Sequence, residues 1–139
     1  MKVEIPDLTG AECGEIAITA AEGGIGYWSI IDAYRPTRDD GLGEGWVDPK
    51  TNECLDVADD FVFYTLHEIS DEKASEYEGM EEDITPRLIR LGLETAITEG
   101  FLSAVSLLAS AREDWTSIID SELADTIIQI GMFGEVRYG

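Results

Sequence analysis

The chain has 139 residues, with thirty acidic and nine basic side chains and a formal net charge of −21 at pH 7. This length is typical of one domain and suffices to bury a core. The hydrophobic fraction of 44% excludes a disordered acidic tail. No stretch approaches the roughly 18 apolar residues of a membrane span, and residues 1–6 lack a signal-peptide pattern. We expect a single cytoplasmic domain over residues 1–139.

The first predicted element is a helix that begins after Thr9 and ends at Gly23-Gly24. Thr9 and Glu12 have the spacing of a capping box, in which a hydroxyl and a carboxylate each bind the other residue's amide. We expect a glycine to end the helix in the left-handed conformation. Apolar residues recur between these ends at one-face helical spacing: Cys13, Ile16, Ala17 and Ala20.

Two strands are predicted next, at residues 27–34 and 61–69, where aromatic and β-branched residues are frequent. Their proximity in the chain favours a hairpin. The intervening residues 37–53 are rich in glycine and acids and indicate a loop. Alternation in the second strand places Phe61, Phe63, Thr65, His67 and Ile69 on one face, and Val62, Tyr64, Leu66 and Glu68 on the other.

The rest of the chain has helical spacing. Thr85-Pro86 is a strong helix start, and residues 86–98 are apolar on most sides, which predicts a helix central to the core. Helical spacing continues over 101–111, and a last helix is expected from Asp120 to Gly131 or Gly134, followed by a tail or terminal strand. The fold class is therefore α+β, with a small antiparallel sheet packed against three or four mainly C-terminal helices.

One candidate ligand site lies in the glycine-rich turn after the first helix. Backbone amides in such a turn can approach a ligand, and aromatic rings can stack on a planar one. The alternative is a helix cap followed by core aromatics. The candidate residues are Gly23, Gly24, Gly26, Tyr27 and Trp28.

The second candidate is an acidic protein-interaction surface. Between residues 38 and 83 there are sixteen acids and three bases. Such a surface repels nucleic acid and anionic membranes and favours basic partners, including nucleic-acid-binding proteins. The alternative is that the acids serve solubility. The candidate patch comprises Asp71, Glu72, Glu76, Glu78, Glu81, Glu82 and Asp83.

Catalytic and metal signatures are missing from the sequence. His67 and Glu68 are adjacent strand residues and point to opposite faces, so they cannot act together. Cys13 and Cys54 form neither a disulfide framework nor a zinc motif, and the acidic loops lack EF-hand spacing. We expect no enzymatic activity, cofactor or metal. Arg87 and Arg90 are expected to form internal ion pairs with acids.

Two segments resemble a group of small acidic proteins encoded by phages of actinobacteria. Residues 21–28 resemble the group's "EGG, two residues, YW" segment, and the helix start at residues 84–86 fits as well. The end of the chain resembles the group's C-terminus in residues 124–129, 133–136 and 138–139. The group has no settled activity, so the resemblance implies no catalytic residue.

The resemblance implies a phage accessory protein, and such small acidic proteins often inhibit host machinery or immunity. Our main hypothesis is a non-enzymatic anti-defence protein or DNA mimic that binds a basic host factor through its acidic surface, in the host cytoplasm. A second hypothesis is a nucleotide-like ligand binder that uses Tyr27 and Trp28. A third is a structural or oligomeric virion component. A further copy of the chain is also a candidate partner, in a homo-oligomer.

Overall fold

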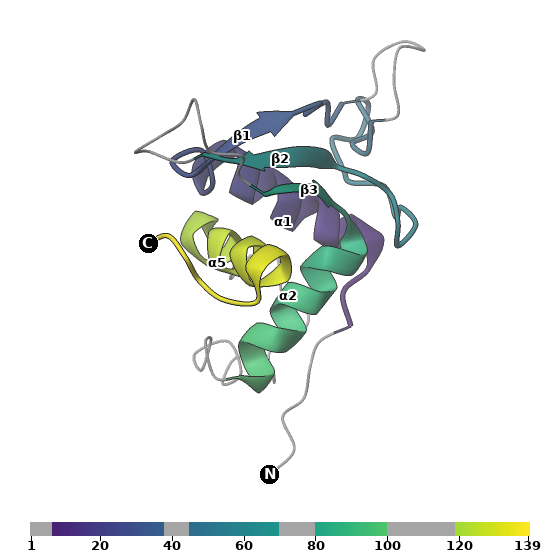
Figure 1. The fold of residues 1–139 in the computed structure, drawn as a ribbon. Helices are drawn as coiled ribbons and strands as arrows, with labels where there is room; N and C mark the ends of the chain where they lie inside the picture. The colour runs from purple at the N-terminus through teal and green to yellow at the C-terminus, as the bar shows by residue number, and fades with distance from the viewer. Residues whose placement is uncertain (1–6, 38–44, 70–79, 100–118) are drawn as a thin grey trace.

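The computed structural model describes residues 7–37, 45–69, 80–99 and 119–139. A three-stranded antiparallel sheet lies against a layer of three helices (Figure 1). The predicted α+β class and the small antiparallel sheet are confirmed, although one helix precedes the sheet and the expected helix at 101–111 lies outside the described residues. The described elements are α1 (Gly10–Gly23), β1 (Ser29–Asp32), β2 (Tyr64–Glu68), β3 (Glu81–Ile84), α2 (Pro86–Thr98) and α5 (Ser121–Phe133).

Helix α1 begins at the predicted capping box. The Glu12 amide donates to the Thr9 hydroxyl at 3.1 Å, and the Thr9 amide donates to the Glu12 carboxylate at 2.8 Å. The expected left-handed glycine cap is wrong, because Gly24 has a φ of −120° and its amide donates to the Ala20 carbonyl at 2.8 Å. Glycine is required here for space, since a Cβ on Gly24 would lie 2.5 Å from the Ser121 carbonyl oxygen.

The sheet has the order β1-β2-β3, and the predicted antiparallel pairing of the first two strands is confirmed. Strand β1 is shorter than expected because Tyr27 and Trp28 lie in the preceding turn and Ala33 has a φ of 59°. Strand β3 was not predicted. Its four residues include three acids, and only Ile84 is buried, so it lacks the usual hydrophobic alternation.

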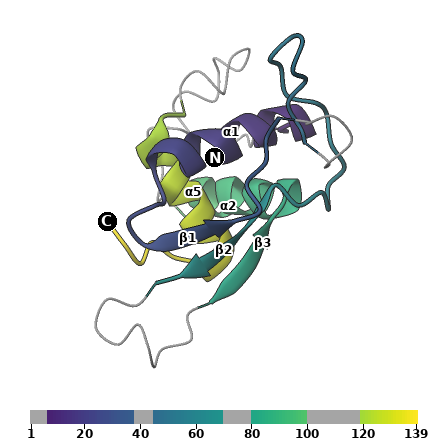
Figure 2. The same cartoon turned by 90° about the horizontal axis from the view of Figure 1, so that it is seen from above.

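Side chains of β2 alternate between the core and the opposite face. Tyr64, Leu66 and Glu68 are buried, whereas Thr65 and His67 are half-buried and point the other way. The Tyr64 hydroxyl donates to the Ala17 carbonyl of α1 at 2.7 Å, which ties the sheet to the helical layer. The core thus lies between the sheet and the helices, as Figures 1 and 2 show from two directions.

Helices α2 and α5 pack most closely where Gly92 approaches α5. A Cβ on Gly92 would lie 2.2 Å from the Ile127 carbonyl oxygen, so glycine lets the two backbones nearly touch. Helix α2 was expected to be buried on most sides, but Leu91 is 52% exposed. Helix α5 packs against both α1 and α2 and is at least as central. No helix in the described part of the chain is long and apolar enough to cross a membrane.

Candidate functional site

A buried carboxylate joins the glycine-rich turn to α5. Asp125 accepts hydrogen bonds from the Trp28 indole at 2.8 Å, from the Tyr27 hydroxyl at 2.7 Å and from the Gln129 amide at 2.9 Å. Burial, together with the hydrogen bond to Asp125, raises the pKa of Tyr27 to about 12. Asp125 therefore holds both aromatic residues of the turn in place.

Gln129, one helical turn further along α5, holds the tail after Gly134. Its side-chain oxygen accepts from the amides of Arg137 at 2.8 Å and Tyr138 at 2.9 Å, and its amide nitrogen donates to the Tyr138 carbonyl at 3.0 Å. The side chain thus bonds to the tail backbone as a neighbouring strand would. The tail itself has no strand, contrary to one of the two expectations for it.

The tail also covers a buried acid on β2. The Glu68 side chain is 2% exposed, and it accepts from the Tyr138 hydroxyl, from the Met80 amide at 3.1 Å and from the Arg137 guanidinium at 3.4 Å. Burial acts to raise the pKa of Glu68, but these donors outweigh it and leave the pKa lowered. We call Trp28, Glu68, Asp125, Gln129, Arg137 and Tyr138 the tail network.

The tail network brings together the two segments on which the phage resemblance rests. Trp28 belongs to the first segment, and Phe133 and Tyr138, which pack on its ring, belong to the second. Trp28 is 1% exposed, so its ring is not available to a ligand. This packing gives Trp28, Phe133 and Tyr138 a structural role that needs no ligand.

The glycine-rich turn nevertheless borders a shallow pocket of about 320 Å³. Gly23, Gly24, Gly26 and Tyr27 line it, whereas Trp28 does not. The Gly24 amide is already used within the α1 cap. Glu22 is the one charged residue among the described lining residues, which include no base, and this disfavours a phosphate-bearing ligand.

The second candidate surface is the face of the sheet opposite the helices. Figure 2 looks onto this face, and no described helix lies over the strands. His67 lies at its centre, with its Nε2 2.8 Å from Asp32 of β1 and its Nδ1 4.0 Å from Glu81 of β3. Six residues, fixed by the strand register, form this outer sheet face: Ile30, Asp32, Thr65, His67, Glu81 and Asp83.

Three of the six residues of the outer sheet face are acids. The side chains of Asp32 and Glu81 are 65% and 64% exposed. Asp83 accepts from the Thr65 hydroxyl at 2.8 Å and is exposed. Opposed positions on β1 and β3 are two strand spacings, about 10 Å, apart. The face therefore presents carboxylates on both sides of β2.

Only part of the predicted acidic patch can be placed. Glu81, Glu82 and Asp83 form most of β3, with Glu82 half-buried on the side away from the outer sheet face. Asp71, Glu72, Glu76 and Glu78 lie outside the described residues. Asp32 was not in the predicted patch, because only the strand register places it beside the others.

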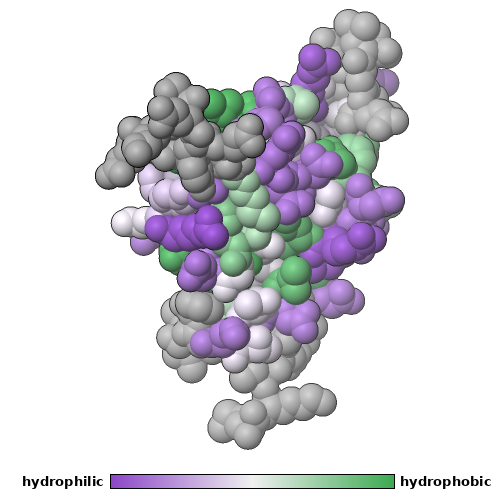
Figure 3. Space-filling model, viewed as in Figure 1, coloured by the Kyte–Doolittle hydropathy of each residue, from purple (hydrophilic) through white to green (hydrophobic). Residues whose placement is uncertain are grey.

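Acids elsewhere are dispersed or paired internally. Figure 3 shows hydrophilic residues spread over one side of the molecule, interspersed with smaller apolar groups. Arg87 and Arg90 both pair with Asp59, Arg87 at 3.0 Å, which confirms their expected internal role.

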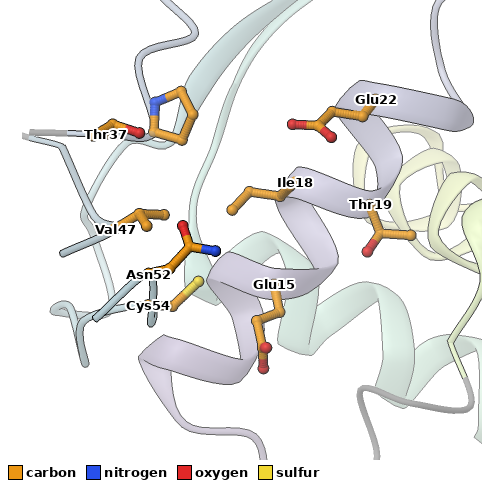
Figure 4. Close-up of a pocket in the computed structure, with 9 residues that line it drawn as sticks. Glu15, Ile18, Thr19, Glu22, Thr37, Val47, Asn52 and Cys54 are labelled. Atoms are coloured by element: carbon orange, nitrogen blue, oxygen red, sulfur yellow. The ribbon is translucent and has the colours of Figure 1, made fainter. Parts of the chain in front are cut away.

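A second pocket separates α1 from the irregular segment that follows β1 (Figure 4). It has a volume of about 380 Å³, and we call it the helix–loop cleft. Burial, and to a smaller extent Glu15, raises the pKa of Cys54 in its wall to about 11, so this thiol is protonated at neutral pH. Its lining residues are Glu15, Ile18, Thr19, Glu22, Pro36, Thr37, Val47, Asn52 and Cys54.

Sequence reasoning missed the helix–loop cleft and the tail network. The spacing of Glu15, Ile18 and Glu22 on one face of α1 was available, but not the wall that faces them. Comparisons of the chain with protein-family models, with curated proteins and with solved structures found no match. The site geometry is therefore the basis for any functional proposal.

Proposed function

We propose that this protein binds a basic partner protein through the outer sheet face and blocks it, without catalysing a reaction. The observation that carries the proposal is the set of three exposed carboxylates on the two strands that flank β2, with no described helix above them: Asp32 on β1, and Glu81 and Asp83 on β3. Carboxylates on an open face attract cationic side chains, and the net charge of −21 extends this attraction over distance.

The expected partner is a nucleic-acid-binding host factor, such as a nuclease or another defence component. Its binding surface is built to receive phosphates and would accept carboxylates in their place, so the protein would compete with nucleic acid. The resemblance to phage proteins favours a host target. The alternative is that the acids serve only to keep the protein soluble, which would also explain the net charge. In that case, no partner would lose binding when these three residues are replaced.

The test is a pull-down from host lysate at about 50 and 300 mM salt, because charge-driven contacts weaken as the screening length shortens. The bait proteins are wild type, a face variant (D32N/E81Q/D83N) and a matched variant (D60N/E94Q/E99Q). The matched variant removes the same number of charges from exposed positions outside the outer sheet face.

We expect wild type and the matched variant to retain the same basic protein at low salt, and the face variant to lose it. Purified partner should then be displaced from the complex by duplex DNA. Retention that is insensitive to salt, or equal loss from both variants, would refute the proposal.

The nucleotide-like alternative is supported only by the pocket beside Tyr27. A thermal-shift screen against nucleotides tests it, because a ligand that binds the folded state raises Tm by mass action. The virion alternative stays a prediction, which sizing chromatography and the protein composition of virions would test.

A further inference from the structure

The helix–loop cleft has acids at its two ends and an apolar middle. Glu15 and Glu22 are seven residues apart on α1 and lie on one face of the helix, with Ile18 between them. At 1.5 Å per residue, their backbones are separated by about 10 Å along the helix axis. Figure 4 shows Glu22 at one end of the cleft, Glu15 at the other and Ile18 pointing across it.

The described residues of the opposite wall include no acid, but this wall is also polar at its ends and apolar in its middle. Val47 faces Ile18 across the middle, Thr37 lies across the cleft at the Glu22 end, and Asn52 and Cys54 lie toward the Glu15 end (Figure 4). This wall is held by backbone pairing, because Val47 forms bridges to both Thr37 and Cys54. Its shape is therefore set by the fold.

The chemistry of the lining selects a class of ligand. Carboxylates at both ends favour cations, the amide of Asn52 and the hydroxyl of Thr37 add hydrogen-bonding groups, and the middle favours methylene groups. No lining residue is basic, so anionic ligands are repelled. A compact aromatic cation with one charge would contact only one of the two carboxylates, which are about 10 Å apart along the helix.

We propose that the helix–loop cleft binds a linear aliphatic diamine or polyamine, with one ammonium group at Glu15, one at Glu22 and the methylene chain between Ile18 and Val47. This site is separate from the outer sheet face, and ligand binding here does not depend on the partner proposed above.

The test uses α,ω-diamines of increasing chain length, with butylamine as a one-charge control, and calorimetry at about 150 mM salt to screen diffuse attraction. We expect saturable binding with one preferred chain length. The variant E15Q/E22Q should bind about tenfold more weakly, the loss expected for about 1.4 kcal/mol of charged contact. The glutamine at position 22 keeps an oxygen that can accept from the Tyr34 hydroxyl, as Glu22 does at 2.8 Å.

The matched control is E94Q/E99Q, which removes two exposed carboxylates from the end of α2 and should leave the affinity within about twofold of wild type. A second measurement follows alkylation of Cys54, which the bound diamine should slow while buried Cys13 is unaffected. Absent binding, equal affinity for butylamine, or an equal loss in the control variant would overturn the proposal, and none of these results bears on the outer sheet face.

Discussion

The rings of Trp28 and Tyr138 stack with their centroids 5.5 Å apart and an angle of 5° between their planes. Phe133 meets the same indole edge-on, at 5.6 Å and 61°. Trp28, which directly precedes β1, is thereby enclosed by the last residue of α5 and by the tail. Aromatic pairs of this kind contribute about 0.5–1.5 kcal/mol beyond the area they bury, so Tyr138 ties the otherwise exposed tail to the core.

Replacement of Trp28 by Phe should destabilise the protein more than the same replacement of Trp46. Both tryptophans are 1% exposed, but Trp28 donates to buried Asp125 at 2.8 Å. Among the described residues, the Trp46 indole nitrogen is the one buried side-chain donor without a hydrogen-bond partner. A hydrogen bond to a charged group contributes about 1.5–3 kcal/mol, and W28F should exceed W46F by roughly that amount in urea denaturation. If the two variants lose the same free energy of unfolding, the hydrogen bond from the Trp28 indole to Asp125 does not contribute to stability.

The variant Tyr138→Phe should become unstable at a higher pH than wild type. The lowered pKa of Glu68 means that ionised Glu68 stabilises the fold above the ordinary carboxyl pKa, and that this contribution is lost as pH falls through the folded-state value. Removal of the Tyr138 hydroxyl takes away one donor to Glu68 and raises that folded-state pKa. Urea denaturation at a series of pH values between about pH 3 and pH 7 would measure this. As the pH is lowered, the free energy of unfolding of the variant should begin to fall at a higher pH than that of wild type.

The control for this prediction is Glu68→Gln, which has no carboxyl to titrate. The difference in free energy of unfolding between wild type and Glu68→Gln should shrink as the pH is lowered. If Tyr138→Phe and wild type lose stability in parallel across the range, the Tyr138 hydroxyl does not control the ionisation of Glu68.

Replacement of Gly24 by Ala should destabilise the fold, whereas replacement of Gly26 by Ala should not. A Cβ at Gly24 would lie 2.5 Å from the Ser121 carbonyl oxygen, while one at Gly26 meets no atom within 4 Å. Overpacking of this kind costs about 1–3 kcal/mol, and loss of glycine flexibility in the unfolded chain stabilises by up to about 1 kcal/mol. Thermal denaturation should show a lower Tm for G24A only. If the Tm of G24A equals that of wild type, α5 must shift to make room for the added methyl group.

Both cysteines should react slowly with iodoacetamide, and Cys54 should react before Cys13. Burial raises the pKa of Cys13 to about 12 and is the main cause of the value of about 11 for Cys54. Because the thiolate is the nucleophile, only about one Cys54 thiol in a thousand is reactive at a pH near 8. Mass spectrometry after timed alkylation checks the order. Fast reaction of Cys13 would indicate that the contact between α1 and α2 opens readily.

Local signals predicted the ends of the helices well. Helix-capping interactions act over three or four residues, so a short stretch of sequence contains all of the interacting groups. This holds for the capping box at Thr9 and Glu12, the helix start at Thr85-Pro86 and the cap at Asp120. The left-handed end of α5 at Gly134, with a φ of 77°, is of the same kind.

Features that depend on distant partners were not predictable. Strand β3 has three acids in four residues and forms because β2 offers it a backbone edge, which no local pattern reports. Asp125 and Gln129 look like ordinary polar helix positions until the tail and the glycine-rich turn fold against them. For the same reason the sequence indicated the acids of β3 but not Asp32, which reaches them only through the register.

The tail network also sets an order of events during synthesis. Trp28 and Glu68 leave the ribosome long before Tyr138, which completes the enclosure of both. Until then, the nascent chain carries an indole lacking its stacking partner and a carboxylate lacking one of its donors. Incomplete chains of this kind expose surface that favours misassembly. We therefore expect the native state to be reached only after translation has passed residue 138.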